Sequence, residues 1–233
     1  MFILLQLLAA FTADSAGSDE LVIACVGDSL TSGVGSTGEN HTNAYPAALK
    51  RNPKFSGYAI HNFGDGGKCA IKSTGTNSYW KTKKYAKAMA SNPNIVVLML
   101  GTNDAKEHHW NDAAYREDLA DMIKGFQNLS SKPTVYLGIP PPVYSTKHIY
   151  MIQPDVVNVV LPRIIPLIAK ACNVKTIDIF EAFGGTAQNY TKAYRVTEAK
   201  PMGEWPNDGV HFSDFGYSVL ADNVAKVLLA DRP

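Results

Sequence analysis

The sequence has little excess charge of either sign, and this excludes several classes of protein. Its 233 residues carry a formal net charge of +1, and only 18% of them are charged. So neutral a chain gives no electrostatic reason to bind nucleic acid or an anionic membrane surface. Because 45% of the residues are hydrophobic, the chain can bury a core of its own. We therefore expect a globular protein, and not a disordered chain, a coiled coil or a multi-span membrane protein.

Cysteine is also scarce, which argues against a disulfide framework and against a metal site. The three cysteines are Cys25, Cys69 and Cys172, and an odd number leaves at least one unpaired. Cys25 lies within an apolar segment and is expected in the core, whereas a bridge involving Cys69 stays open. No C-x-x-C spacing occurs, and the adjacent His108 and His109 cannot direct both rings to one helical face. We therefore predict no metal and no cofactor.

The first residues form an apolar run, Phe2–Phe11, that is too short to span a bilayer but has the length of a signal-peptide core. Small residues follow up to Gly17, so we expect a signal peptide over 1–17 and a single domain over 18–233, with no stable membrane insertion. No Lys or Arg precedes the run, and the alternative is an apolar segment packed on the domain. N-x-[ST] sequons fit a secreted glycoprotein; they begin at Asn40, Asn128 and Asn189.

Apolar segments of strand length alternate with segments in which apolar residues recur every three or four positions, and this pattern is typical of an α/β protein. The strands are expected at Leu21–Val26, Tyr58–Phe63, Ile95–Leu100, Thr134–Ile139 and Val174–Ile179. The helices are expected at Asn43–Arg51, Tyr79–Ala90, Asp112–Asn128, Val156–Cys172 and Ser213–Leu229.

Continuous apolar strands are typical of a parallel sheet that is covered on both faces. We therefore predict a three-layer α/β/α sandwich with a mainly parallel five-stranded sheet. Pro162 and Pro166 are expected to kink or shorten the fourth helix, and Ser213 or Asp214 to cap the last one. A long loop is expected over Gly184–Pro206.

Four polar segments carry the candidate chemistry: Gly27–Thr31, Asn62–Gly67, Gly101–Asp104 and Asp208–His211. Three of them follow expected strands and the fourth precedes the last helix, so all four can converge on one edge of the sheet. Taken alone, each is also typical of an ordinary turn. Together they contain a serine, a histidine with an aspartate three residues before it, and groups that can donate hydrogen bonds to an oxyanion.

This set of segments, in this order, resembles the SGNH/GDSL hydrolase family over nearly the whole chain, from Val22 to His211. The resemblance implies a flavodoxin-like fold and a serine esterase. It implies that Ser29 is the nucleophile, that His211 is the general base, and that Asp208 orients this base.

The resemblance also implies an oxyanion hole made of the backbone N–H groups of Ser29 and Gly67 and the side chain of Asn103. Gly67 is preferred over Gly66 because it lies five residues after Asn62, the spacing seen in the family. That choice stays open.

Two other classes of protein are alternatives to the esterase. Gly33–Gly38 matches G-x-G-x-x-G, which favours a dinucleotide-binding enzyme. However, the first glycine comes well after the strand end, and the expected acidic residue is missing where the second strand ends in Asn62. A non-catalytic carbohydrate-binding domain on the same fold is the other class, since fold does not determine function. The complete set of polar segments argues against it.

The substrate is expected to be a short-chain ester, most plausibly an acetyl ester of a carbohydrate. No long amphipathic segment is available as a lipid-facing lid, and Lys132–Pro142 and Tyr79–Lys83 resemble the carbohydrate-esterase-like members of the family. A lysophospholipase, or a longer-chain esterase or thioesterase, is the alternative. The candidate substrate contacts are Asp28 and a set of aromatic side chains able to stack on a sugar ring. These aromatic side chains are Trp80, His109, Trp110, Tyr144 and Trp205.

Overall fold

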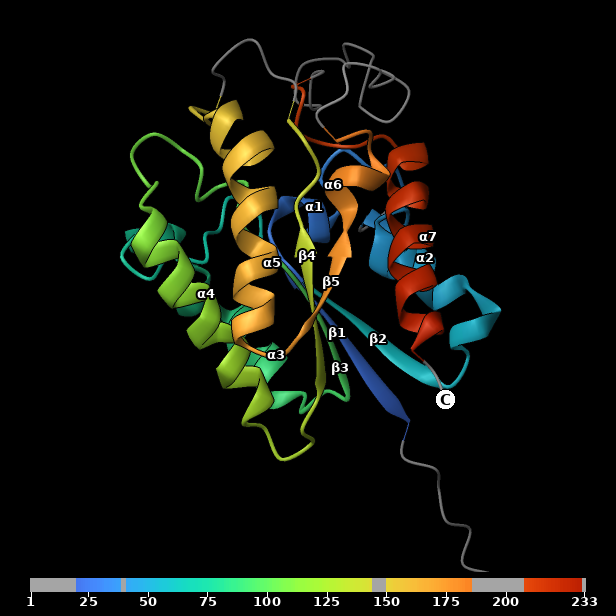
Figure 1. Cartoon of the computed structure of the whole chain (residues 1–233). Helices are drawn as coiled ribbons and strands as arrows, with labels where there is room; N and C mark the ends of the chain where they lie inside the picture. The colour runs from blue at the N-terminus through green and yellow to red at the C-terminus, as the bar shows by residue number, and fades with distance from the viewer. Residues whose placement is uncertain (1–19, 39–40, 144–149, 186–207, 232–233) are drawn as a thin grey trace, which may run out of the picture.

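The computed structural model describes residues 20–38, 41–143, 150–185 and 208–231 (Figure 1). These residues form a five-stranded parallel sheet with the strand order β2-β1-β3-β4-β5. The predicted α/β/α sandwich is thus confirmed. The strands are β1 (Leu21–Gly27), β2 (Tyr58–Gly64), β3 (Ile95–Met99), β4 (Thr134–Ile139) and β5 (Lys175–Asp178). The α-helices are α1 (Ser29–Ser32), α2 (Tyr45–Arg51), α3 (Lys83–Ala90), α4 (Asp112–Gln127), α5 (Leu161–Ala171), α6 (Ile179–Ala182) and α7 (Asp214–Ala230).

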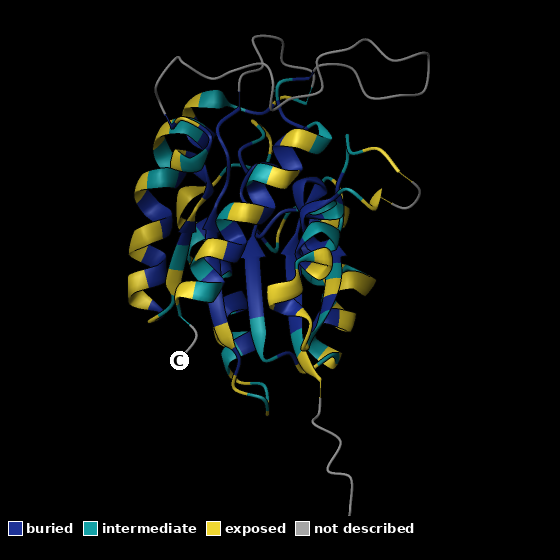
Figure 2. Cartoon of the chain, turned by 90° about the vertical axis from the view of Figure 1, so that its right-hand side faces the viewer, coloured by how far each residue is buried: buried dark blue, intermediate teal, exposed yellow. Residues whose placement is uncertain are grey.

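Helices cover both faces of the sheet, which is why its three central strands, β1, β3 and β4, are mainly apolar. Successive side chains of a strand point to opposite faces. In β1, Ala24 and Val26 belong to the core cluster formed with α3, α4 and α5, whereas Ile23 and Cys25 belong to the one formed with α2 and α7. Figure 1 shows these two groups of helices on opposite sides of the sheet, and Figure 2 shows the strands buried between them.

Two predicted helices begin about one turn later than their hydrophobic patterns suggested. The segment expected from Tyr79 starts with a short 3-10 turn, and α3 begins only at Lys83 because the side chain of Thr82 caps it. The segment expected from Val156 starts with a π-helical turn, and α5 begins at Leu161. Pro162 then occupies the first turn of α5, where a missing N–H group costs least.

Other expectations can be compared with the described residues directly. All three cysteines are free and buried, so Cys69 forms no disulfide. The Ser213 side chain accepts a hydrogen bond from the Gly216 N–H and caps α7, as predicted. Within the described ranges, no helix has the length and apolar character needed to cross a bilayer, and no three His, Cys, Asp or Glu side chains form a metal-binding group. Most of the loop expected over Gly184–Pro206, and all of residues 1–17, lie outside the described residues.

Candidate active site

The turn from β1 into α1 holds Ser29 at the carboxyl edge of the sheet. The Asp28 side chain caps α1 by accepting a hydrogen bond from the Leu30 N–H at 2.9 Å. Ser29 is the first residue of this short helix, and only 9% of it is exposed. The turn is so tight that it leaves no room for a side chain at Gly27: an added Cβ would lie 2.2 Å from the Thr31 hydroxyl. Packing therefore holds the Ser29 hydroxyl in a defined position.

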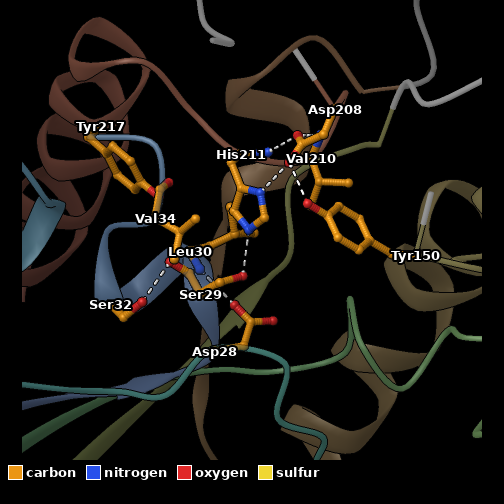
Figure 3. Close-up of polar contacts among 10 residues, drawn as sticks. All are labelled: Asp28, Ser29, Leu30, Ser32, Val34, Tyr150, Asp208, Val210, His211 and Tyr217. Carbon is orange, nitrogen blue, oxygen red and sulfur yellow. Dashed lines mark hydrogen bonds and ion pairs between the residues drawn. The ribbon is translucent and has the colours of Figure 1, made fainter. Parts of the chain in front are cut away.

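His211 joins Ser29 to Asp208, although Ser29 and His211 are 182 residues apart in the chain. The Nε2 atom of His211 lies 2.9 Å from Ser29 Oγ, and its Nδ1 atom lies 2.5 Å from Asp208 Oδ2 (Figure 3). The other Asp208 oxygen accepts the backbone N–H groups of Val210 and His211, at 2.8 and 2.9 Å. In this arrangement Nδ1–H donates to the carboxylate, which leaves Nε2 free to accept the serine proton.

The environment of Asp208 keeps its carboxyl group ionised. Burial by itself would raise the pKa of Asp208, but the hydrogen bond and the charge of His211, together with the two backbone N–H groups, lower this pKa to about 2. At neutral pH the carboxylate is therefore negative beside the imidazole. A fixed negative charge in this position stabilises the imidazolium that forms when His211 takes up a proton.

Asn103 and Asp28 form a buried pair next to Ser29. The Asn103 amide donates one hydrogen bond to Asp28 Oδ2 at 3.2 Å, and the second N–H of an amide can then serve another acceptor. Burial raises the pKa of Asp28 to about 6, against the lowering effects of the Leu30 N–H, His211 and Asn103. Asp28 was predicted to contact substrate. Its two oxygens instead bond to protein groups, and it is not among the residues lining the pocket described below.

The glycine segment after β2 faces the same site. Gly66 and Gly67 both line the pocket that contains Ser29, and Gly67 has a φ of 77°, a conformation that favours glycine. The segment that follows is held by Asp104, whose carboxylate accepts the N–H groups of Ala70 and Ile71 at 3.0 and 2.9 Å. The choice between Gly66 and Gly67 as an oxyanion donor stays a prediction.

Ser29 and His211 open into a pocket of about 360 Å³. Ligand pockets in proteins typically measure about 300 to 1,000 Å³. Asn103 and the two glycines line this pocket, and the side chain of Lys106 adds a cation. The remaining described wall is mainly apolar; it includes Val34, Thr102, Tyr150, Ile152 and Val210.

Two of the predicted tryptophan contacts, Trp80 and Trp110, pack against the core and are not in the described pocket wall. The Trp80 indole N–H donates to the backbone carbonyl of Ala70, and its ring packs against the core cluster under α3 and α4. The Trp110 ring lies 5.6 Å from the Tyr115 ring in the same cluster. Neither is among the described residues that line the pocket, because both aromatic surfaces are used in packing.

His109 is also absent from the described pocket wall. Its Nδ1 atom lies 3.1 Å from the Asn103 carbonyl oxygen and 3.3 Å from Cys69 Sγ, behind the wall that carries Asn103. Burial lowers the pKa of His109, which keeps the ring neutral at pH 7. The other two predicted aromatic contacts, Tyr144 and Trp205, lie outside the described residues.

Tyr150 and Lys106 are site residues that the sequence interpretation missed. Both line the pocket, and the Tyr150 hydroxyl donates to Asp208 Oδ2 at 3.2 Å. Neither residue lies within one of the four polar segments. No local pattern marks a single tyrosine 58 residues before the aspartate that it contacts, so the sequence held no signal that would have identified it.

A parallel sheet with a serine, a histidine and an aspartate joined at its carboxyl edge is the arrangement of a serine-type hydrolase. The family model of the GDSL-like lipase/acylhydrolase family matches residues 25–219. This chain belongs to that family.

Individual relatives agree with this assignment. An acetylxylan esterase from Xylanibacter ruminicola is 33% identical over 116 residues, which cover 49% of this chain and 24% of that protein. The chain thus matches only about a quarter of the length of this curated relative.

Solved structures share the fold at lower identity. The lipase/acylhydrolase from Enterococcus faecalis is 23% identical, with a TM-score of 0.67 over 90% of this chain and 96% of that one. Est24, a carbohydrate acetylesterase from Sinorhizobium meliloti, is 16% identical, with a TM-score of 0.66 over 90% and 99% of the two chains. The acetyl xylan esterase AlAXEase is 22% identical, with a TM-score of 0.63 over 89% and 100%. At these identities the likeness concerns the fold alone.

Proposed function

We propose that this protein hydrolyses short-chain acyl esters, in particular acetyl esters of carbohydrates, through an acyl-enzyme on Ser29. The observation that carries the proposal is the continuous series of contacts from Ser29 Oγ through His211 to Asp208, which opens into a pocket. Ester cleavage needs a nucleophile, a base within hydrogen-bond reach and donors aimed at the oxyanion.

The reaction proceeds in two halves. His211 Nε2 accepts the Ser29 hydroxyl proton while Oγ attacks the ester carbonyl carbon, and the carbonyl oxygen becomes an oxyanion. The donors assigned to this oxyanion are the Ser29 N–H, the Gly67 N–H and the second amide N–H of Asn103. His211 then protonates the departing alcohol oxygen. In the second half His211 takes a proton from water while the water oxygen attacks the acyl carbon. The bond between that carbon and Ser29 Oγ then breaks, His211 returns its proton to Oγ, and the acid is released.

Two observations support a small acyl group on a sugar. The described pocket is at the lower end of the usual size range, and the relative that shares 33% identity is named an acetylxylan esterase. The aromatic stacking proposed for Tyr144 and Trp205 belongs to this same proposal.

The test compares wild type with Ser29→Ala on p-nitrophenyl acetate, butyrate and octanoate, followed by acetate release from acetylated xylan. We expect the highest kcat/KM on acetate, release of acetate from the polysaccharide, and loss of activity by a factor of about 10⁴ or more in the variant. A preference for octanoate would redirect the assignment to a longer-chain esterase or lysophospholipase. Binding of acetylated xylan without turnover would instead indicate a carbohydrate-binding domain.

We also propose a secretory route and N-glycosylation. Asn128 is exposed at the end of α4, where a glycan could be accepted, whereas Asn40 and Asn189 lie outside the described residues. Expression in a eukaryotic secretory host should yield a glycoprotein in the medium whose apparent mass falls on treatment with an N-glycosidase. Retention in the cell at the unmodified mass would refute this proposal.

A further inference from the structure

Tyr150 contacts the aspartate–histidine pair from the opposite wall of the pocket. Its hydroxyl lies 3.2 Å from Asp208 Oδ2, the same oxygen that accepts His211 Nδ1. Its ring meets the imidazole edge to face, with the ring centres 6.0 Å apart and the planes at 85°. Figure 3 shows Asp208 between the tyrosine hydroxyl and the imidazole.

The tyrosine hydroxyl is the donor in this contact. Burial, together with the negative charge of Asp208, raises the pKa of Tyr150, so the phenol stays protonated throughout the range in which the enzyme would work. At 3.2 Å the contact is longer than a short charge-assisted O–H···O bond, so it adds a weaker restraint on Asp208 than the 2.5 Å contact with His211. The Tyr150 bond nevertheless restrains rotation of the Asp208 carboxylate about its side-chain bonds.

The chain segment that carries Tyr150 is attached to the segment that follows Asn103. Lys106 and Ile152 form an antiparallel bridge. Backbone hydrogen bonds extend it on both sides, from the N–H of residue 107 to the carbonyl of residue 151 at 3.0 Å, and from the N–H of residue 153 to the carbonyl of residue 105 at 2.9 Å. A displacement of Tyr150 relative to Asn103 would have to break this pairing.

We propose that Tyr150 is a positioning residue for the reaction proposed above: its hydroxyl orients Asp208, and through it the His211 ring, toward Ser29. Through the pairing of residues 105–107 with residues 151–153, Tyr150 also couples the base to the wall that carries the oxyanion donor Asn103. The inference rests on the proposed function for its kinetic consequences only, because the orientation and basicity of His211 can be measured without a substrate.

Removing the hydroxyl should have a defined electrostatic effect. With one donor fewer, more of the negative charge of Asp208 acts on His211, and the imidazolium becomes more favourable. Within the described part of the chain, the other titratable groups near this pair include Asp28, which interacts with His211, and Lys106, which lines the same pocket. Neither is altered by a Tyr150→Phe substitution. The pH midpoint of His211 should therefore move upward in that variant.

The structure offers a matched control for this substitution. Tyr136 on β4 also donates its hydroxyl to a carboxylate, Asp231 Oδ2 at 2.8 Å, just beyond the C-terminal end of α7 and outside the pocket. Tyr136→Phe removes the same kind of bond without touching the site. Any effect of losing a tyrosine–aspartate bond on stability alone should appear in both variants.

The experiment measures kcat and KM for p-nitrophenyl acetate as a function of pH, and the His211 titration by NMR, in wild type, Tyr150→Phe and Tyr136→Phe. For Tyr150→Phe we expect kcat to fall about tenfold with little change in KM, equivalent to about 1.4 kcal/mol. The acid limb of the profile and the His211 midpoint should both move to higher pH. Tyr136→Phe should match wild type in kcat, in the acid limb of the profile and in the His211 midpoint. Tyr150→Leu, which also lacks the hydroxyl, should shift the His211 midpoint in the same direction and serves if the phenylalanine variant does not fold.

Three results would overturn the inference. One is a folded Tyr150→Phe variant whose kcat and His211 midpoint equal those of the Tyr136→Phe control. Another is a change confined to KM, which would make Tyr150 a substrate contact only. The third is a His211 midpoint that moves downward or stays in place in both Tyr150 variants. Absence of esterase activity in wild type would refute the proposed function, while the NMR titration would still decide whether Tyr150 acts on His211.

Discussion

Asn103→Ala is the substitution that most directly tests the proposed oxyanion hole. The side chain is buried beside Ser29, and its amide has one N–H committed to Asp28 Oδ2 at 3.2 Å. The second N–H is the one assigned to the developing oxyanion. Loss of one such donor typically lowers kcat by about 10² to 10³, or about 2.7 to 4 kcal/mol. We expect a fall of this size in kcat, with a much smaller change in KM.

The same substitution removes a partner of a buried carboxylate, and this second effect must be separated from the first. Without the amide, Asp28 loses one of the groups that hold down its pKa, which is already raised to about 6. We expect the pKa of Asp28 to rise further, and the free energy of unfolding to fall by about 1 to 3 kcal/mol at neutral pH.

Asn94→Ala provides the control for a loss of stability by itself. The Asn94 side chain accepts the backbone N–H of Val22 at 2.8 Å, far from Ser29 at the opposite end of β1. Both variants should unfold at lower denaturant concentration, but only Asn103→Ala should lose turnover. If Asn103→Ala keeps kcat within about threefold of wild type while losing stability like the control, Asn103 does not stabilise the transition state.

Three further perturbations follow from the packing and charges. Asp104→Ala leaves two buried backbone N–H groups without their acceptor, so the free energy of unfolding measured with denaturant should fall by about 2 to 6 kcal/mol. A fall of less than about 0.5 kcal/mol would contradict this role of Asp104. Gly64→Ala places a Cβ 2.1 Å from a backbone nitrogen of α1. We expect it to cost about 1 to 3 kcal/mol and to lower kcat, and unchanged values would refute the close packing. Because the folded pKa of Asp208 is lowered to about 2, its stabilisation is complete only above about pH 5 and is lost as the pH falls through 2. When the stability of Asp208→Asn is measured as the pH is lowered, it should not show this loss. Parallel stability curves for wild type and the variant would exclude the lowered pKa assigned to Asp208.

Much of the fold could be read from the sequence because its signals are local. Continuous apolar runs mark strands buried on both faces, and β1 and β4 lie where the runs Leu21–Val26 and Thr134–Ile139 predicted them. Helix starts were less predictable. The start of α3 depends on a capping bond from Thr82 that competes with the hydrophobic pattern, and the start of α5 on a proline in its first turn.

The site was predictable in part for the same reason. In a parallel sheet the carboxyl ends of all strands meet at one edge, so polar segments that follow strands are brought together by topology alone. This is why Ser29 and Asn103 could be expected to converge before any contact was known, whereas the Asp208–His211 segment precedes the last helix and does not follow a strand. The three-residue spacing of Asp208 and His211 also made their contact a local matter, closed by backbone hydrogen bonds within one turn.

By itself, then, the sequence determined the layer architecture, the strand ends and the residue types at the edge of the sheet, because these depend on periodicity and on short-range spacing. Only the tertiary structure decided which neighbouring side chains face the pocket. Trp80 and Trp110 pack against the core, where part of their large apolar surfaces is buried. Tyr150 reaches Asp208 because residues 105–107 and 151–153 pair, and such pairing between distant segments leaves no periodic trace in the chain.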